Sequence, residues 1–154
     1  MAYYRNKVVD IVKSWNGCVK GDKTHMEILA LYNGHSPLAR GWKMTKEQPW
    51  CASTVSAAFI KAGYADICPV ECGSGEMIRK AIKMNIWVES DNYVAKPGDI
   101  IMYDWDDSAL NYAKTDNEGW PEHTGIIIGC NGKTFTVREG NFRNGCNVRT
   151  LEVN

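Results

Sequence analysis

One apolar helix constrains this chain more than any other part of its sequence. Residues 51–62 follow Pro49, begin with Cys51 and end at Gly63. The apolar residues of this segment recur at the spacing of one buried helix face: Ala52, Val55, Phe59 and Ile60. A proline before the segment and a glycine after it mark the two ends of a helix. We therefore predict a buried central helix with a thiol at its N-terminus.

Residues able to perform thiol chemistry follow that helix in a fixed order. His123 opens an apolar stretch, and Glu139 and Asn141 lie on the next one. A helix N-terminus favours a thiolate, an imidazole can take the thiol proton, and a third polar group can orient the imidazole. A cysteine in an apolar helix is by itself more often structural. The order of the residues is what predicts nucleophilic catalysis by Cys51.

Length and charge limit the partners of the chain. Its 154 residues suit a single domain over residues 1–154. Lys plus Arg and Asp plus Glu both number 18, so nothing predicts binding to nucleic acid. No apolar run approaches the ~18 residues of a membrane span, and no secretory signal is visible at the N-terminus. We expect synthesis in the cytoplasm and no membrane insertion.

The six cysteines could form three disulfides in a secreted protein. The absence of a visible signal favours a reducing compartment with mostly free thiols instead. Cys68 and Cys72 have the spacing of half a zinc site, but no second ligand pair follows at a usual distance. Cys72 is also the rival nucleophile, although it lacks a helix start and a buried helix behind it. We predict no metal and no cofactor.

Helices are expected before strands. The four predicted helices lie at residues 8–15, 25–34, 51–62 and 76–84. The predicted strands lie at residues 100–103, 125–130, 134–139 and 147–153, with a polar insertion at 104–120. The capping box Thr24–Glu27 starts the second helix at His25, so His25 and His35 are expected to be exposed or capping residues. This order predicts an α+β fold.

The register of one hairpin decides whether the polar residues meet. Residues 131–132 read Asn-Gly, and a strict two-residue turn there would direct Glu139 and Asn141 away from the face of His123. A three-residue loop at 131–133, or a bulge of equal effect, places His123 opposite Asn141 with Glu139 on the same face. Since the chemistry needs a shared face, we predict the longer loop or the bulge.

Four segments together resemble the CHAP domain, the cysteine, histidine-dependent amidohydrolase/peptidase of the papain-like superfamily. These segments are Trp50–Ala52, Lys96–Ile101, His123–Ile126 and Glu139–Asn141. Residues 33–41 and 98–105 look especially like prophage versions from clostridia. The resemblance covers the whole chain in outline. It implies N-terminal helices packed on a C-terminal antiparallel sheet, and hydrolysis of an amide bond in bacterial peptidoglycan.

The resemblance also implies roles for individual residues. Cys51 is the expected nucleophile and His123 the general base and then the acid, while Asn141 or Glu139 orients the imidazole. The Cys51 backbone N–H is the natural oxyanion donor, and Gln48 is a candidate second donor. The candidates for the groove walls are Trp50, Trp42 and Trp120. Some relatives bind calcium in an acidic loop, which is poorly developed here.

The resemblance leaves the scissile bond open. An N-acetylmuramoyl-L-alanine amidase is favoured, and a peptidoglycan endopeptidase or a cysteine peptidase on protein substrates is the alternative. A catalytically silent wall-binding module would be a different class. We expect action at the cell wall after holin-type lysis or on a phage particle, with a separate wall-binding domain as a further candidate partner.

Overall fold

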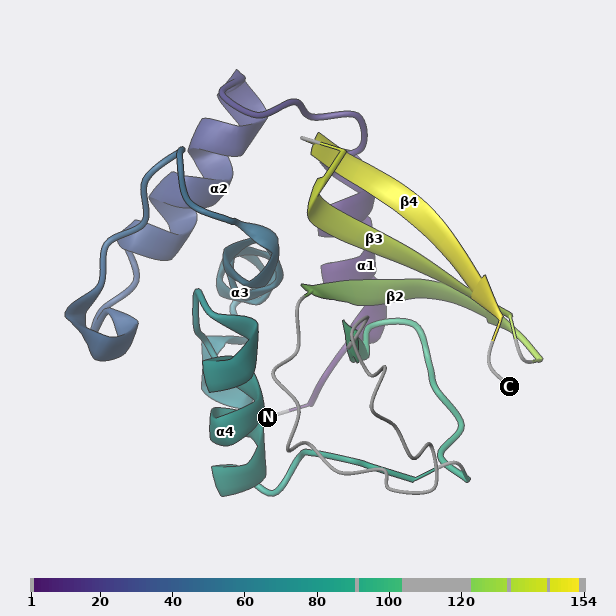
Figure 1. Cartoon of the computed structure of the whole chain (residues 1–154). Coiled ribbons are helices and arrows are strands. Elements are labelled where there is room, and N and C mark those ends of the chain that lie inside the picture. Colours follow the sequence, from purple (N-terminus) through teal and green to yellow (C-terminus); the bar gives the residue numbers. More distant parts are fainter. Residues whose placement is uncertain (1, 91, 104–122, 133, 144, 153–154) are drawn as a thin grey trace, which may run out of the picture.

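The computed structural model describes residues 2–90, 92–103, 123–132, 134–143 and 145–152, so the predicted insertion at 104–120 lies outside the described residues. Within them, four α-helices precede a four-stranded antiparallel sheet (Figure 1). The helices are α1 (Arg5–Ser14), α2 (Lys23–Asn33), α3 (Cys51–Ala62) and α4 (Ser74–Lys83). The strands, in spatial order, are β1 (Ile100–Tyr103), β2 (His123–Asn131), β3 (Thr134–Phe142) and β4 (Gly145–Glu152). This arrangement confirms the predicted α+β fold.

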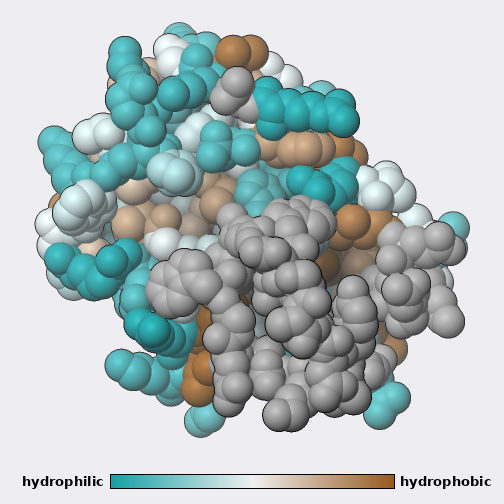
Figure 2. Space-filling view, in the orientation of Figure 1, coloured by the Kyte–Doolittle hydropathy of each residue, from teal (hydrophilic) through white to brown (hydrophobic). Residues whose placement is uncertain are grey.

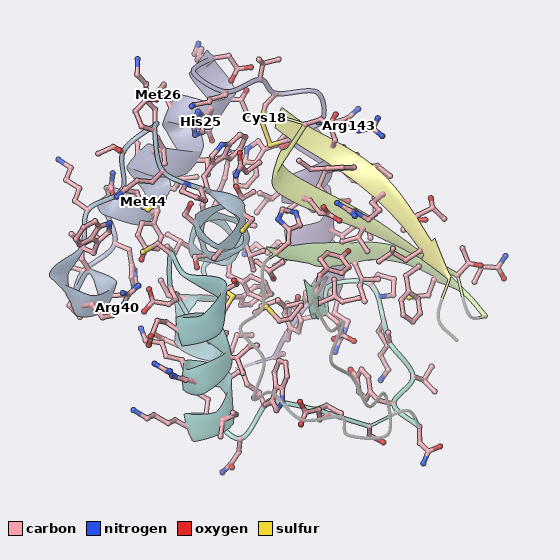
Figure 3. All side chains as sticks on the ribbon, in the orientation of Figure 1. Cys18, His25, Met26, Arg40, Met44 and Arg143 are labelled. Carbon is pink, nitrogen blue, oxygen red and sulfur yellow. A yellow bond between two sulfur atoms is a disulfide. The ribbon has the colours of Figure 1, made fainter. Side chains whose placement is uncertain are left out.

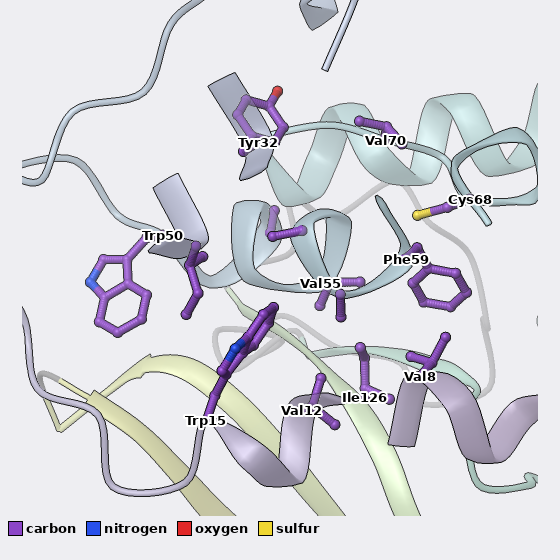
Figure 4. Close-up of a cluster of buried hydrophobic side chains, with 14 of the residues drawn as sticks. Val8, Val12, Trp15, Tyr32, Trp50, Val55, Phe59, Cys68, Val70 and Ile126 are labelled. Carbon is purple, nitrogen blue, oxygen red and sulfur yellow. The ribbon is translucent and has the colours of Figure 1, made fainter. Parts of the chain in front are cut away.

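Helix α3 is the centre of the core, as its sequence predicts. All but two of its residues are buried, and it ends at Gly63, whose φ of 83° is the left-handed conformation that favours glycine. Apolar side chains of α1, α2 and β2 close around it (Figure 4). The largest contributors on those elements include Val8, Val12, Ile28 and Ile126. None of the helices in the described part of the chain combines the length and apolarity of a membrane span.

The β2–β3 hairpin has the register predicted from the chemistry. Ile126 lies opposite Arg138, whereas Gly129 lies opposite Thr136, so β2 carries one extra residue at Ile128. Next to the turn, Asn131 pairs with Thr134, which is later than a strict turn at 131–132 would allow, and the bulge shifts the pairing back by one residue toward the site. The predicted register is therefore confirmed, and it results from the later turn together with the bulge.

Helix α2 begins earlier than its capping box predicts. Asp22 is the N-cap, and its carboxylate accepts hydrogen bonds from the backbone N–H groups of His25 and Val19, each at 2.8 Å. His25 is fully buried and packs on Trp50 with ring centroids 4.0 Å apart, while its Nδ1 accepts from the Gly21 N–H. The prediction of an exposed or capping His25 is wrong, because the first turn of α2 lies against the core.

One disulfide is present among the six cysteines. Cys18 and Cys146 are bonded across 128 residues of sequence and are both buried (Figure 3). The backbones around them pair as well, since the Cys146 N–H donates to the Cys18 carbonyl at 3.0 Å. The other four cysteines are free, as expected of most of the thiols. Local spacing could not predict the pair, because the contact exists only after β4 docks beside the end of α1.

Candidate active site

Helix α3 places Cys51 at its first turn. The residue is 7% exposed, and the positive end of the helix lies at its backbone. A thiolate there is stabilised by the unpaired backbone N–H groups of the first turn. The sequence-predicted thiol is therefore present in the setting its chemistry needs.

Strand β2 places His123 at its first position, opposite Tyr103 of β1. The imidazole is largely buried and stacks on the Tyr103 ring at a centroid distance of 5.8 Å. Its Nε2 lies 2.7 Å from Oε1 of Glu139, and the Cys51 side chain is close enough to raise the pKa of the ring. Glu139 occupies Nε2, so Nδ1 is the ring nitrogen that remains available to another partner.

The charge state of His123 follows from these neighbours. Burial alone disfavours the protonated ring, but the hydrogen bonds to Cys51 and Glu139 and their negative charges outweigh it. Together they raise the pKa of His123 to about 9. The ring therefore carries its second proton at neutral pH, as a proton donor to a leaving group must.

Glu139 provides the third group. It is fully buried and lies on β3, where its Oε1 contacts His123 and its Oε2 accepts from the Tyr103 hydroxyl at 3.0 Å. Arg149 of β4 also faces this carboxylate, with Nη2 3.0 Å from Oε1 and Nε 2.8 Å from Oε2. Sequence reasoning missed Tyr103 and Arg149. Strand alternation was the available signal, but it needed the β3–β4 register as well.

Asn141 does not reach the imidazole. The β3–β4 pairing is irregular between Glu139 and Phe142, and Asn141 has a φ of 56°. Its side chain has no hydrogen bond within the described residues. Of the two candidates for orienting His123, the structure brings Glu139 to the ring and leaves Asn141 beside the site.

The predicted substrate-binding residues fall into different environments. Trp50 is 1% exposed and packs on His25, so the prediction that it walls an open groove is wrong; the N-cap position of α3 turns this side chain into the core. Trp42 is 52% exposed and free to contact a ligand. The Gln48 amide oxygen accepts from the Thr45 N–H at 2.9 Å. Trp120 lies outside the described residues.

The surface near α3 combines apolar and hydrophilic side chains. Figure 2 shows apolar side chains in a hollow near the position of α3, framed by hydrophilic groups. The exposed Trp42 follows the η1 turn (Ala39–Gly41), whose Arg40 forms a bidentate ion pair with the buried Glu71. This pair fixes the loop before α3 against the start of α4.

Cys72, the rival thiol, has a different environment. Its Sγ lies 3.6 Å from Nη2 of Arg40 and 3.6 Å from Oε1 of Glu71. Burial, together with the charge of Glu71, raises the pKa of the Cys72 thiol. No histidine among the described residues hydrogen-bonds it. This thiol is therefore less suited to nucleophilic attack than Cys51.

Comparison with known proteins identifies the family. The model of the CHAP domain matches residues 42–141, well over half of the chain, and the match includes Cys51, His123, Glu139 and Asn141. No curated protein and no solved structure matches the chain. CHAP domains are cysteine- and histidine-dependent hydrolases that act on peptidoglycan as amidases or peptidases. With its buried cysteine and its hydrogen-bonded histidine and glutamate inside the matched region, the chain belongs to the CHAP domain family.

Proposed function

We propose that this protein is an N-acetylmuramoyl-L-alanine amidase that works through Cys51, His123 and Glu139. The observation that carries the proposal is the position of His123, whose ring hydrogen-bonds a buried carboxylate and has its pKa raised by the Cys51 side chain. This is the arrangement of nucleophile, base and orienting group that covalent amide hydrolysis needs.

The first half of the reaction forms an acyl-enzyme. His123 holds the proton of the Cys51 thiol, and the thiolate attacks the carbonyl carbon of the lactyl amide. The Cys51 backbone N–H, at the start of α3, stabilises the resulting oxyanion. The carbon–nitrogen bond then breaks, and His123 gives its proton to the nitrogen of the departing L-alanine. The muramoyl group remains on Cys51 as a thioester.

The second half releases the product. A water molecule loses a proton to His123 and attacks the thioester, which yields the muramoyl carboxylic acid and the free thiol. Glu139 keeps the imidazole oriented in both halves, and its negative charge stabilises the protonated ring. We propose a lytic role at the cell wall, in a phage setting, on the strength of the motif resemblance.

The test is digestion of purified Gram-positive peptidoglycan, followed by mass spectrometry of the products. We expect free stem peptides beginning with L-alanine from the wild type, and none from Cys51→Ala. Cys72→Ala is the matched thiol control and should retain activity. Products cut inside the stem or cross-bridge would replace the amidase proposal by an endopeptidase. Wall binding without products would indicate a silent module.

Glu139 and Asn141 are distinguished by separate variants. We expect Glu139→Gln to reduce turnover on the order of 10²-fold or more, because the imidazolium loses its charged partner. Asn141→Ala should cost less, since its side chain does not touch the ring. The reverse ranking would show that Asn141 moves to His123 when substrate binds.

A further inference from the structure

The carboxylate of Glu139 is unusual in being fully buried and yet contacted at both oxygens. Oε1 faces His123 at 2.7 Å and Nη2 of Arg149 at 3.0 Å. Oε2 faces the Tyr103 hydroxyl at 3.0 Å and Nε of Arg149 at 2.8 Å. An isolated buried carboxylate would become protonated rather than remain charged. Arg149 is the one permanently charged cation among these contacts.

Arg149 is held rigidly enough to orient its partner. Its guanidinium carbon lies 4.2 Å from the centre of the Phe142 ring and 5.3 Å from that of Tyr103. Its side chain is only 21% exposed, so solvent screens its charge weakly. A planar guanidinium fixed by aromatic rings and facing both carboxylate oxygens restricts the rotation of that carboxylate.

The sheet brings these groups together from four strands. Arg149 lies opposite Val137, and Glu139 lies opposite Asn147, so Arg149 and Glu139 are diagonal neighbours on one face. Tyr103 of β1 and His123 of β2 form the facing pair on the same side. The arginine is thus separated from Cys51 by two side chains, Glu139 and His123.

We propose that Arg149 is a positioning residue for the reaction: its guanidinium holds the Glu139 carboxylate aligned to accept the hydrogen bond of His123. This inference rests on the proposed function, which assigns the imidazole its task. It adds a fourth group, on β4, outside the region that the family model matches.

The proposal has an electrostatic consequence that packing alone would not produce. The charged and titratable groups facing Glu139 in the described structure are His123 from β2, Tyr103 from β1 and Arg149 from β4, and His123 links them to Cys51 of α3. Removal of a cation makes every neighbouring acid hold its proton more tightly. The pH–activity profile should therefore move to higher pH when Arg149 is neutralised.

Three variants test the proposal. Arg149→Met removes the charge and keeps much of the apolar stem, and Arg149→Lys restores a charge without the planar fork. Arg143→Met is the matched control, because Arg143 also lies against the Phe142 ring, at 5.1 Å, and forms no hydrogen bond or ion pair with Glu139 within the described residues. Each is assayed for rate against pH on a soluble muropeptide and for the NMR titration of the His123 ring.

In Arg149→Met, we expect the acid limb of the pH–rate profile to move up by about one pH unit or more. The midpoint of the His123 NMR titration should rise with it. Arg149→Lys should return the limb toward its wild-type position at a lower maximal rate, and Arg143→Met should leave the limb unmoved. A lower rate with unmoved limb and unmoved midpoint in Arg149→Met would overturn the proposal and leave Arg149 a packing residue. The NMR titration needs no substrate, so it tests the role of Arg149 even if the wild type fails to cleave muropeptides. Failure to cleave muropeptides would refute the proposed function and leave the test of Arg149 intact.

Discussion

A single methyl group added at Gly140 should move the β3 side of the site, which carries Glu139, away from the α3 side, which carries Cys51. Gly140 follows Glu139 on β3 and faces Thr54, one turn beyond Cys51 on α3. A Cβ on Gly140 would overlap Thr54 Oγ1 and lie 2.6 Å from Thr54 Cβ, far closer than atoms can approach. Thr54 cannot swing away freely, because it is buried and its hydroxyl donates to the Trp50 carbonyl at 2.6 Å. Gly140→Ala must therefore push β3 from α3.

The size of the effect follows from these contacts. Forcing a methyl group into a packed interface costs about 1–3 kcal/mol, and the clash with Cβ of a helix residue favours the upper end. For a domain of this length the loss corresponds to a fall of roughly 3–10 °C in Tm. Because Glu139 is the adjacent residue, a displacement near 1 Å would also misplace the carboxylate, at a cost of roughly 10²-fold in rate.

Urea unfolding and muropeptide hydrolysis measure the two effects. Gly129→Ala is the control in the same hairpin, since its Cβ would meet nothing nearer than Thr136 Cβ at 3.9 Å. Thr54→Ala should cost less stability in the Gly140→Ala background than in the wild type, because it removes the clashing hydroxyl. Gly140→Ala with the stability and rate of Gly129→Ala would refute the argument that this contact sets the spacing of the site.

Four further predictions follow from individual contacts and groups in the structure. Gly125→Ala should lower activity at least ~10-fold, because its Cβ would lie 2.8 Å from Glu139 Cγ and displace the carboxylate; crystallography of the variant would show the shift. Activity should fall as pH rises through about 9, where His123 loses its proton, and a pH–rate profile would show this limb. Because the pKa of His123 is raised above its unfolded value of ~6.5, protonation of the ring stabilises the fold fully below pH ~6.5, and this stabilisation is lost as the pH rises through about 9. Urea unfolding should show this pH dependence in the wild type and not in His123→Ala. Cys18→Ala should cost about 2–5 kcal/mol of unfolding free energy, whereas Cys130→Ala at an exposed free thiol should cost under ~0.5 kcal/mol.

Those features of the fold that depend on local chemistry were predictable from the sequence. The bounds of α3 follow from its apolar spacing and from Gly63, and β1 follows from an apolar run after a turn. The register beside His123 could be predicted because only one pairing puts it on the face of Glu139. These predictions succeed because each depends on residues close in sequence or on a chemical requirement.

The features that the sequence did not predict depend on packing between helices and strands that are distant in the sequence. Trp50 and His25 bury each other only when α2 packs beside the start of α3, so neither local pattern indicated a core residue. The contact of Arg149 with Glu139 depends on the β3–β4 register, which is irregular between Glu139 and Phe142. No local signal distinguished Glu139 from Asn141, because the positive φ at Asn141 arises within that irregular pairing.

The region that carries the family match cannot be the whole folding unit. Residues 42–141 contain the catalytic candidates, but α1, α2 and β4 lie outside them. Val8, Val12 and Ile28 are at most 1% exposed against the core around α3, and each buried aliphatic side chain contributes about 1.5–3 kcal/mol. Their combined loss of roughly 5–9 kcal/mol approaches the total stability of an ordinary domain. A fragment of residues 42–141 should therefore lack a cooperative unfolding transition by circular dichroism, whereas the full chain should show one. If the fragment folded and cleaved peptidoglycan, α3 would need neither the N-terminal helices nor Arg149, and the role assigned to β4 would fail with it.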